Sequence, residues 1–141
     1  MLREVIHCRG HENVKATHRS TLEITTEDFL TPRGDCIICV SADKALSDLS
    51  EDFKNALRRG ARLRVVIRAG NLSDELTAYG SPELKLESPV SMVIRKSNYI
   101  DARTLAIKAT KSARDIKREL VELLRNPETI VTVELIIEEK A

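Results

Sequence analysis

The chain of 141 residues has no tryptophan and only two phenylalanines and two tyrosines, so it offers little aromatic surface for stacking unpaired nucleic-acid bases. It has no apolar run near the roughly 20 residues that a membrane-spanning helix needs. Its first residues show no apolar segment of a signal peptide. With a net charge of +1, it also lacks a general attraction for nucleic acid or anionic membranes. We therefore expect a cytoplasmic protein with no membrane partner.

Cysteine is also scarce, with Cys8, Cys36 and Cys39. An odd number of cysteines in a chain without a signal peptide indicates a reducing, cytosolic compartment. Cys36 and Cys39 have the C-x-x-C spacing, but they lie in the apolar segment CIICV, which is typical of a buried strand. Residues three apart on a strand point to opposite faces. We therefore predict that Cys36 and Cys39 form no disulfide with each other and share no metal.

What the chain does contain is 42% apolar and 32% charged residues, which is typical of one folded domain over residues 1–141. Apolar and polar residues alternate over residues 13–26, which predicts one half-buried strand or two strands in phase. Further strands are expected at residues 2–9, 36–41, 63–69, 74–79, 90–96, 103–109 and 130–138.

Two helices are expected. The first covers residues 51–59, because Ser50 can cap it, acidic residues fill its first turn and Gly60 can end it. The second covers residues 112–125, with Arg118 on its polar face.

The two parts of the chain resemble each other. ICVSADK at residues 38–44 aligns with LAIKATK at 105–111, and a helix and a strand follow in both cases. An internal repeat over about 36–69 and 103–137 is one interpretation, and a coincidence between two amphipathic units is the other. We expect an α+β fold with a mainly antiparallel or mixed sheet, built from two related β-β-α-β halves with two main helices.

Three residues near the N-terminus are candidate acid–base groups: His11, His18 and Glu23. Glu23 lies between threonines on one predicted strand face, whose hydroxyls could hold it as a general base. The favoured alternative is an exposed strand face, where β propensity alone accounts for the threonines. The histidines, with Cys8 and Asp35, supply metal-ligand types without the spacing of a known metal motif. We therefore expect neither a metal nor a cofactor.

Four basic residues are candidates for binding an anion: Lys44, Arg95, Arg103 and Lys111. The two lysines follow predicted strands and precede helices, where free amide groups and the helix dipole favour an anion. The arginines flank the turn before the second of these strands. The alternative is a pair of solvated lysines with an Arg–Asp pair on the surface.

A run of arginines on and before one predicted strand forms a basic cluster: Arg58, Arg59, Arg62, Arg64 and Arg68. RNA binding is conceivable at such a cluster. The alternative is a solvated strand face that is paired with glutamates of a neighbouring element.

Four segments carry a resemblance to a known family. They are GHENVKATHRSTLEIT, LTPRGDCII, SADKA and RKSNYIDARTLAIKA. Over nearly its whole length, the chain resembles an archaeal family known as domain of unknown function 371. The resemblance implies an archaeal source and a small cytosolic protein, and it implies no activity, substrate or catalytic residue. The family has glycine where Cys39 stands, which argues against a role for the C-x-x-C pair.

Three functions follow as expectations. The first is a binder of, or an enzyme acting on, a small anionic metabolite. The second is an RNA-associated binding module that uses the arginine cluster, and the third is a structural subunit of a cytosolic complex. The sequence leaves the enzymatic activity and the oligomeric state open.

Overall fold

The computed structural model describes residues 2–138, which form eight strands, two α-helices and two short 3₁₀ turns. The first half of the chain contains β1 (Arg3–Arg9), β2 (Thr21–Thr25), β3 (Ile37–Cys39), the 3₁₀ turn Leu46–Asp48, α1 (Glu51–Arg58) and β4 (Arg62–Ala69). The second half contains β5 (Leu72–Tyr79), β6 (Ser91–Arg95), β7 (Thr104–Ala106), the 3₁₀ turn Ala113–Asp115, α2 (Arg118–Leu124) and β8 (Ile130–Glu138).

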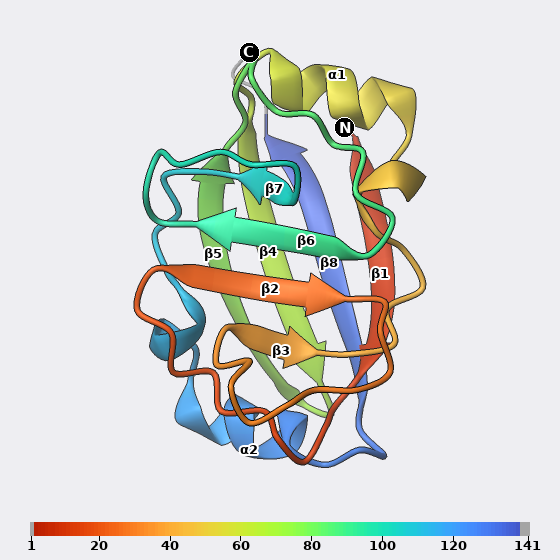
Figure 1. Ribbon diagram of the computed structural model, residues 1–141, viewed down its shortest axis with the longest axis vertical. Coiled ribbons are helices and arrows are strands. Elements are labelled where there is room, and N and C mark those ends of the chain that lie inside the picture. The colour runs from red at the N-terminus through yellow and green to blue at the C-terminus, as the bar shows by residue number, and fades with distance from the viewer. Residues whose placement is uncertain (1, 139–141) are drawn as a thin grey trace.

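The strands form two four-stranded sheets. In the first sheet, with the order β1-β8-β4-β5, every pair is antiparallel. In the second sheet, with the order β3-β2-β6-β7, the central pair is antiparallel and the two outer pairs are parallel. The sheets face each other, and the strands of one run across those of the other (Figure 1). The prediction of an α+β fold with two main helices and antiparallel and mixed pairing is confirmed.

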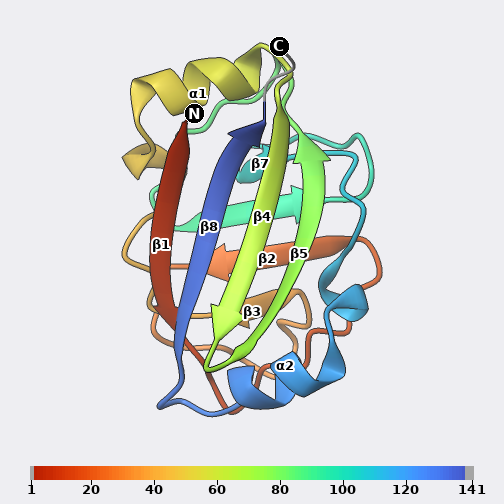
Figure 2. The same ribbon diagram turned by 180° about the vertical axis from the view of Figure 1, so that it is seen from behind.

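The helices lie at opposite ends of the pair of sheets, which Figure 2 shows from behind. One hydrophobic cluster fills the space between the sheets and takes side chains from both helices, including Phe53 of α1 and Leu120 of α2. No helix of residues 2–138 is long and apolar enough to span a membrane.

Both halves have the same order of elements, and the strand register relates them. In the second sheet, the central residue of β2, Glu23, pairs with the central residue of β6, Val93. In the first sheet, Val66 of β4 pairs with Glu134 of β8, and each is the fifth residue of its strand. An approximate two-fold axis through these two pairs therefore relates the halves. Each half has one more short strand than the β-β-α-β unit expected from the sequence, and a repeat over 36–69 and 103–137 stays a prediction.

The helix α1 begins and ends close to the residues expected. The Ser50 hydroxyl accepts a hydrogen bond from the Phe53 amide at 3.2 Å, and Glu51 and Asp52 lie in the first turn. Gly60 follows with a φ of 82°, which glycine adopts without strain. Local signals were therefore sufficient for this helix.

The strand expected over residues 13–26 is much shorter, which corrects the prediction. Only Thr21–Thr25 form a strand, and the residues before it form a loop. Ala16 has a φ of 49°, which interrupts an extended chain. The His18 ring nitrogen Nδ1 accepts hydrogen bonds from the amides of Ser20 and Thr21, which fold the chain into a turn.

The helix expected over residues 112–125 is interrupted, which is a second correction. Ile116 and Lys117 have ψ angles of 139° and 127°, so a 3₁₀ turn and α2 are separate elements. Arg118, the first residue of α2, donates hydrogen bonds to the carbonyls of four residues: Ala16, Ala113, Arg114 and Ile116. Arg118 is exposed, as its predicted place on the polar helix face requires, but its bonds to four backbone carbonyls were not expected.

The cysteines pair in a way that the sequence analysis missed. Cys8 of β1 and Cys39 of β3 form a disulfide with a Cα–Cα distance of 5.8 Å, and Cys36 is free. The prediction that Cys36 and Cys39 form no disulfide with each other is confirmed. The sequence analysis did not foresee the Cys8–Cys39 bond, because residues distant in sequence meet where the two sheets approach each other.

Candidate functional site

The central position on the outer face of the second sheet is a glutamate. Leu22 and Ile24 point into the core, so the alternation of β2 places Glu23 on the opposite face. The Glu23 side chain is only 10% exposed. A carboxylate with so little access to water requires strong hydrogen bonds or ion pairs.

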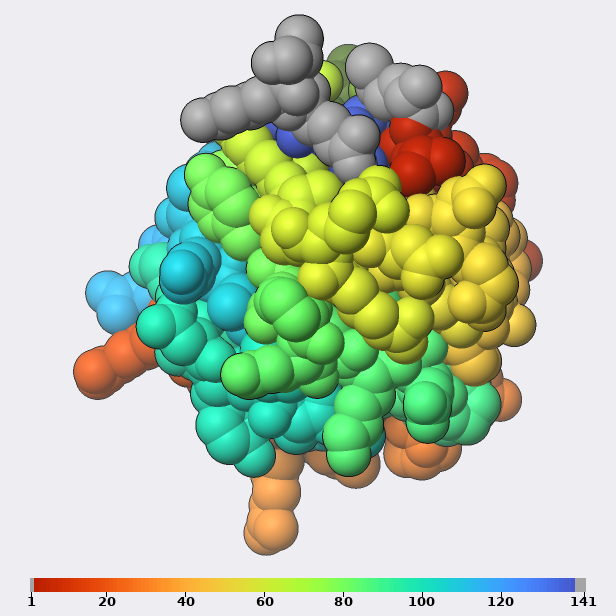
Figure 3. Space-filling view, turned by 90° about the horizontal axis from the view of Figure 1, so that it is seen from above, coloured from red at the N-terminus to blue at the C-terminus, as the bar shows by residue number. Residues whose placement is uncertain are grey.

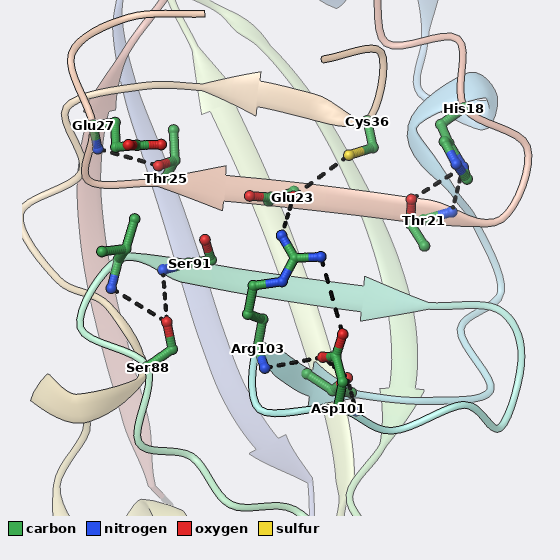
Figure 4. A network of polar contacts seen from close by, with 12 residues as sticks. His18, Thr21, Glu23, Thr25, Glu27, Cys36, Ser88, Ser91, Asp101 and Arg103 are labelled. Atoms are coloured by element: carbon green, nitrogen blue, oxygen red, sulfur yellow. Dashed lines mark hydrogen bonds and ion pairs between the residues drawn. The ribbon is translucent and has the colours of Figure 1, made fainter. Parts of the chain in front are cut away.

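The contacts of Glu23 are long. Its Oε1 atom lies 3.5 Å from the Cys36 sulfur and 3.6 Å from Arg103 Nη1, on opposite sides of β2 (Figure 4). Its Oε2 atom has no partner among the described residues. Charge-assisted hydrogen bonds are usually about 2.7–2.9 Å long. The Glu23 carboxylate therefore keeps unused capacity to accept hydrogen bonds.

Arg103 is the loosely held cation of this cluster. Its side chain is 52% exposed, and its guanidinium lies 3.6 Å from Glu23 and 4.0 Å from Asp101. Arg95, in contrast, is firmly held: it donates to the Thr104 hydroxyl and to Asp101, both at 2.9 Å. Of the two arginines proposed from the sequence, Arg103 is the one that is free to bind a ligand.

Asp101 fixes the turn that carries Arg103. Its Oδ1 atom accepts hydrogen bonds from the Arg103 amide and the Thr104 hydroxyl, and Oδ2 accepts one from Arg95. Burial by itself would raise the pKa of Asp101, but these hydrogen bonds outweigh it and hold the pKa below its usual value. Asp101 therefore stays ionised and acts as the anchor of Arg95.

Cys36 is a neutral thiol. Burial, and then the charge of Glu23, raise its pKa to about 11. The thiol consequently donates a weak hydrogen bond to Glu23 and lacks the thiolate that nucleophilic attack or metal binding needs.

The two histidines proposed as acid–base groups hold turns. Nδ1 of His11 accepts a hydrogen bond from the Asn13 amide at 3.0 Å, and Nδ1 of His18 accepts those of Ser20 and Thr21. The described contacts join neither ring to Glu23. Residues 2–138 contain no group of three or more histidine, cysteine or acidic residues that could hold a metal ion.

The two lysines proposed for anion binding meet carboxylates of the chain itself. Lys44 contacts Glu4 at 2.9 Å, and Glu4 also accepts a hydrogen bond from the amide of Ser50, the cap of α1. Burial alone would raise the pKa of Glu4, but the bonds from Lys44 and Ser50 outweigh it and lower the pKa.

The second half repeats this arrangement. Lys111 contacts Asp74 at 2.6 Å, and Asp74 accepts a hydrogen bond from the amide of Lys117 at the start of α2. The place where the sequence suggested an external anion is thus filled from within in both halves. The described contacts join neither lysine to His11, His18 or Glu23.

The arginine cluster on the first sheet is largely paired. Arg62, Arg64 and Arg68 of β4 contact Glu138, Glu75 and Glu134 on the neighbouring strands. These contacts neutralise the positive charge of β4, in line with the alternative interpretation of this strand face. Arg58 donates instead to the backbone carbonyls of Leu84 and Lys85.

A hollow of about 210 Å³ on another surface contains residues that the sequence analysis did not combine. His7 Nδ1 lies 3.3 Å from Asp43 Oδ2, and Ser41 lines the same hollow. No hydrogen bond joins Ser41 to His7 in the described part of the chain, so an activated serine is not assembled there. The bond between the His7 amide and Asp43 has a counterpart in the second half, between the Thr77 amide and Thr110, which indicates a structural role.

The comparisons with known proteins agree with the resemblance seen in the sequence. The family model described as "Domain of unknown function (DUF371)" matches residues 6–138, which include every candidate site residue. An uncharacterized protein of Methanocaldococcus jannaschii is 49% identical over 127 residues, which cover 90% of this chain and 94% of that relative. The chain therefore belongs to the family described as Domain of unknown function (DUF371).

Proposed function

We propose that the chain binds a small polar ligand that carries an anionic group and, beside it, a hydrogen-bond donor. The observation that carries this proposal is the Glu23 carboxylate, which is nearly buried and, within residues 2–138, has only two contacts, at 3.5 and 3.6 Å. The other buried acidic residues, Glu4, Asp74 and Glu134, each have a basic partner within 2.9 Å, so a poorly paired carboxylate at Glu23 is typical of a binding site.

The arrangement suggests how the ligand would lie. Its anionic group would bind the exposed guanidinium of Arg103, whose planar donors suit a carboxylate or a phosphate. Its donor, a hydroxyl or an ammonium group, would bind the free oxygen of Glu23. Arg103 would exchange two long contacts for short ones, so little interaction is lost when the ligand enters.

Binding is a better proposal than turnover for this site. Glu23 is its one obvious proton acceptor, and Cys36, with a pKa near 11, is a poor proton donor or nucleophile. RNA binding through the arginines of β4 is less favoured, because their charges are paired with glutamates.

We further propose that the protein works in the cytoplasm. The Cys8–Cys39 disulfide is unusual for this compartment, although disulfide-rich intracellular proteins do occur in some archaea, the group to which the matched relative belongs.

Titration of the ¹⁵N-labelled protein with amino acids and with ribose 5-phosphate tests the proposal. The amino acids carry a carboxylate beside an ammonium group, and ribose 5-phosphate carries a phosphate and hydroxyls. We expect saturable shifts of the amides around Glu23, Cys36 and Arg103 for at least one of the probes. Arg103→Ala and Glu23→Gln should each weaken binding about tenfold or more.

Arg62→Ala is the matched control. Arg62 forms an equally long contact, 3.7 Å, and is half exposed, but it lies on the other sheet. Its removal should leave binding unchanged. Absence of saturable shifts with all probes, or equal weakening by Arg62→Ala, would overturn the proposal.

A further inference from the structure

The α-helix of each half lies beside a loop of the other half. That loop leads to a central strand of the second sheet, β2 or β6. α2 lies beside residues 14–17, because Arg118 donates to the Ala16 carbonyl at 3.0 Å. α1 lies beside residues 84–87, because Arg58 donates to the carbonyls there. Ala16 and Leu86 hold the same place in these two loops, with φ angles of 49° and 54°. The two helix–loop contacts can therefore be compared residue by residue.

At α1, Arg58 joins the helix to the loop. Near the end of the helix, its Nε donates to the Leu84 carbonyl at 3.0 Å and its Nη2 to the Lys85 carbonyl at 2.6 Å. Figure 3, which looks onto this end, shows the atoms of α1 in yellow in contact with those of the loop in green.

The contact at α2 is open. A hollow of about 270 Å³ lies there, lined by the apolar Val14 and Val121 and by charged residues of the loop and the helix. Among the described contacts, the Arg125 side chain makes no hydrogen bond to the loop carbonyls, whereas Arg58 makes two at the other end. Its guanidinium lies 3.6 Å from Glu122, and its side chain is 55% exposed.

The charges around this hollow are mainly positive. Lys15, Arg118 and Arg125 line it, with Glu122 as the single acid of the lining. Arg118 stands at the first position of α2, where α1 has Glu51. Lys15 has no ion pair within the described residues. An open, cationic hollow thus lies beside α2, at the place where Arg58 bonds to the loop carbonyls beside α1.

Arg118 gives this hollow a fixed charge. Its Nε and Nη2 atoms are held by the carbonyls of Ala113, Arg114 and Ile116, and its Nη1 atom is held by that of Ala16. The guanidinium therefore needs no ordering when an anion arrives, and it offers mainly its charge and the second hydrogen of Nη1. Lys15 and Arg125 are free to adjust. One fixed and two adjustable cations around a small volume suit an anion with several acceptor oxygens.

We propose that the hollow between residues 14–17 and α2 is a second binding site, specific for a phosphate group. The group can be free phosphate or the phosphate of a small monoester, since both present the same oxygens. The site is independent of the proposed ligand of Glu23, because neither Glu23 nor Arg103 lines it.

Titration of the ¹⁵N-labelled protein with inorganic phosphate, and separately with glycerol 3-phosphate, tests this site at constant ionic strength set with sodium chloride. We expect saturable shifts confined to the amides near Lys15 and from Arg118 to Arg125. A lower Kd for glycerol 3-phosphate would identify a phosphorylated metabolite as the occupant, and equal values would identify the phosphate group alone. Lys15→Ala and Arg125→Ala should each raise the Kd about tenfold.

Lys85→Ala is the matched control, because Lys85 holds the place of Lys15 in the contact at α1. Arg103→Ala is the second control and separates this site from the one at Glu23. Both should leave the Kd unchanged. Absence of saturable shifts overturns the proposal, as does equal weakening by Lys85→Ala. So would Arg125 bonding to the carbonyls of Val14 and Lys15, as Arg58 bonds to the loop carbonyls at α1.

Discussion

The central residues of the two outer sheet faces are both carboxylates, but their surroundings differ. Measured over the whole residue, Glu134 in the first sheet is 6% exposed and Glu23 in the second is 8% exposed. Glu134 lies between two arginines, with Arg3 at 2.5 Å and Arg68 in close contact. Glu23 has one arginine at 3.6 Å and a thiol. Equal burial with unequal pairing separates a carboxylate that holds the fold from one that is available to a ligand.

The same contrast extends to other places where the halves differ. In the first half, Cys8 and Cys39 each come one residue before the bridged pair Arg9 and Val40, and they form a disulfide. In the second half, Ala78 and Ala106 hold the same places before the bridged pair Tyr79 and Ile107. Substitutions that give one half the residues of the other therefore test what each difference contributes.

The largest expected effect comes from replacing the disulfide with the alanines of the second half. The double variant Cys8→Ala/Cys39→Ala should lose about 2–4 kcal/mol in the free energy of unfolding, because the unfolded chain is no longer cross-linked. Urea denaturation without reductant measures this loss, with Cys36→Ala as the control for a free cysteine. An unchanged midpoint would show that the packing of small residues is sufficient in both halves.

The next largest effect is expected for Arg118, the first residue of α2, which holds the place that Glu51 has in α1. Arg118→Ala should cost about 1–3 kcal/mol, because several backbone carbonyls lose a charged donor at once. Arg114→Ala is the control, since the described contacts of Arg114 involve only its backbone. Equal urea midpoints for the two variants would contradict the role assigned to Arg118.

Glu134→Val places a valine at the fifth position of β8, where the paired strand β4 has Val66. We expect a loss of about 1 kcal/mol, since Arg3 and Arg68 lose their shared carboxylate but remain half exposed to water. High salt should reduce the difference between the variant and the native chain. A gain in the free energy of unfolding would contradict a structural role for Glu134.

The carboxylates common to both halves, Glu4 and Asp74, should act at low pH. Their pKa values are lowered in the folded chain, so their stabilisation is complete above the pKa of the unfolded state, about 4, and is lost as the pH falls through the folded values. Urea midpoints from pH 7 to pH 2 measure this decline. Glu4→Gln combined with Asp74→Asn should flatten it, and a curve as steep as that of the native chain would count against the assignment.

The smallest effect on stability is expected at Glu23. Glu23→Val introduces the residue found in β6, and it should leave stability unchanged or raise it by up to about 1 kcal/mol, because a poorly paired carboxylate leaves a nearly buried position. Ligand binding at Arg103 should be lost at the same time. A loss above about 1 kcal/mol would make Glu23 structural, like Glu134.

The sequence predicted those parts of the fold that local patterns determine. The cap at Ser50 and the alternation of β4 were sufficient for α1 and for its neighbour strand. The loop before β2 was missed because its alternation resembles that of a strand, and only the bonds to the His18 ring show that it turns.

The site was predicted in its members but not in its assembly. Glu23 and Arg103 were both candidates, yet their meeting depends on the register between β2 and β6, which no local pattern encodes. For the same reason the sequence did not show that Glu4 and Asp74 form ion pairs with Lys44 and Lys111. Contacts between residues far apart in the chain decide both outcomes.

The position of β8 between β1 and β4 has a consequence for the synthesis of the protein. β1 and β4 are translated well before β8, so β1 lacks its one neighbour in this sheet, and β4 lacks one of its two, until residues 130–138 have followed. Until then the nascent chain exposes unpaired strand edges, which are prone to join other chains. The first sheet can therefore close only after β8 has been translated, and the first half gains no protection from folding on its own.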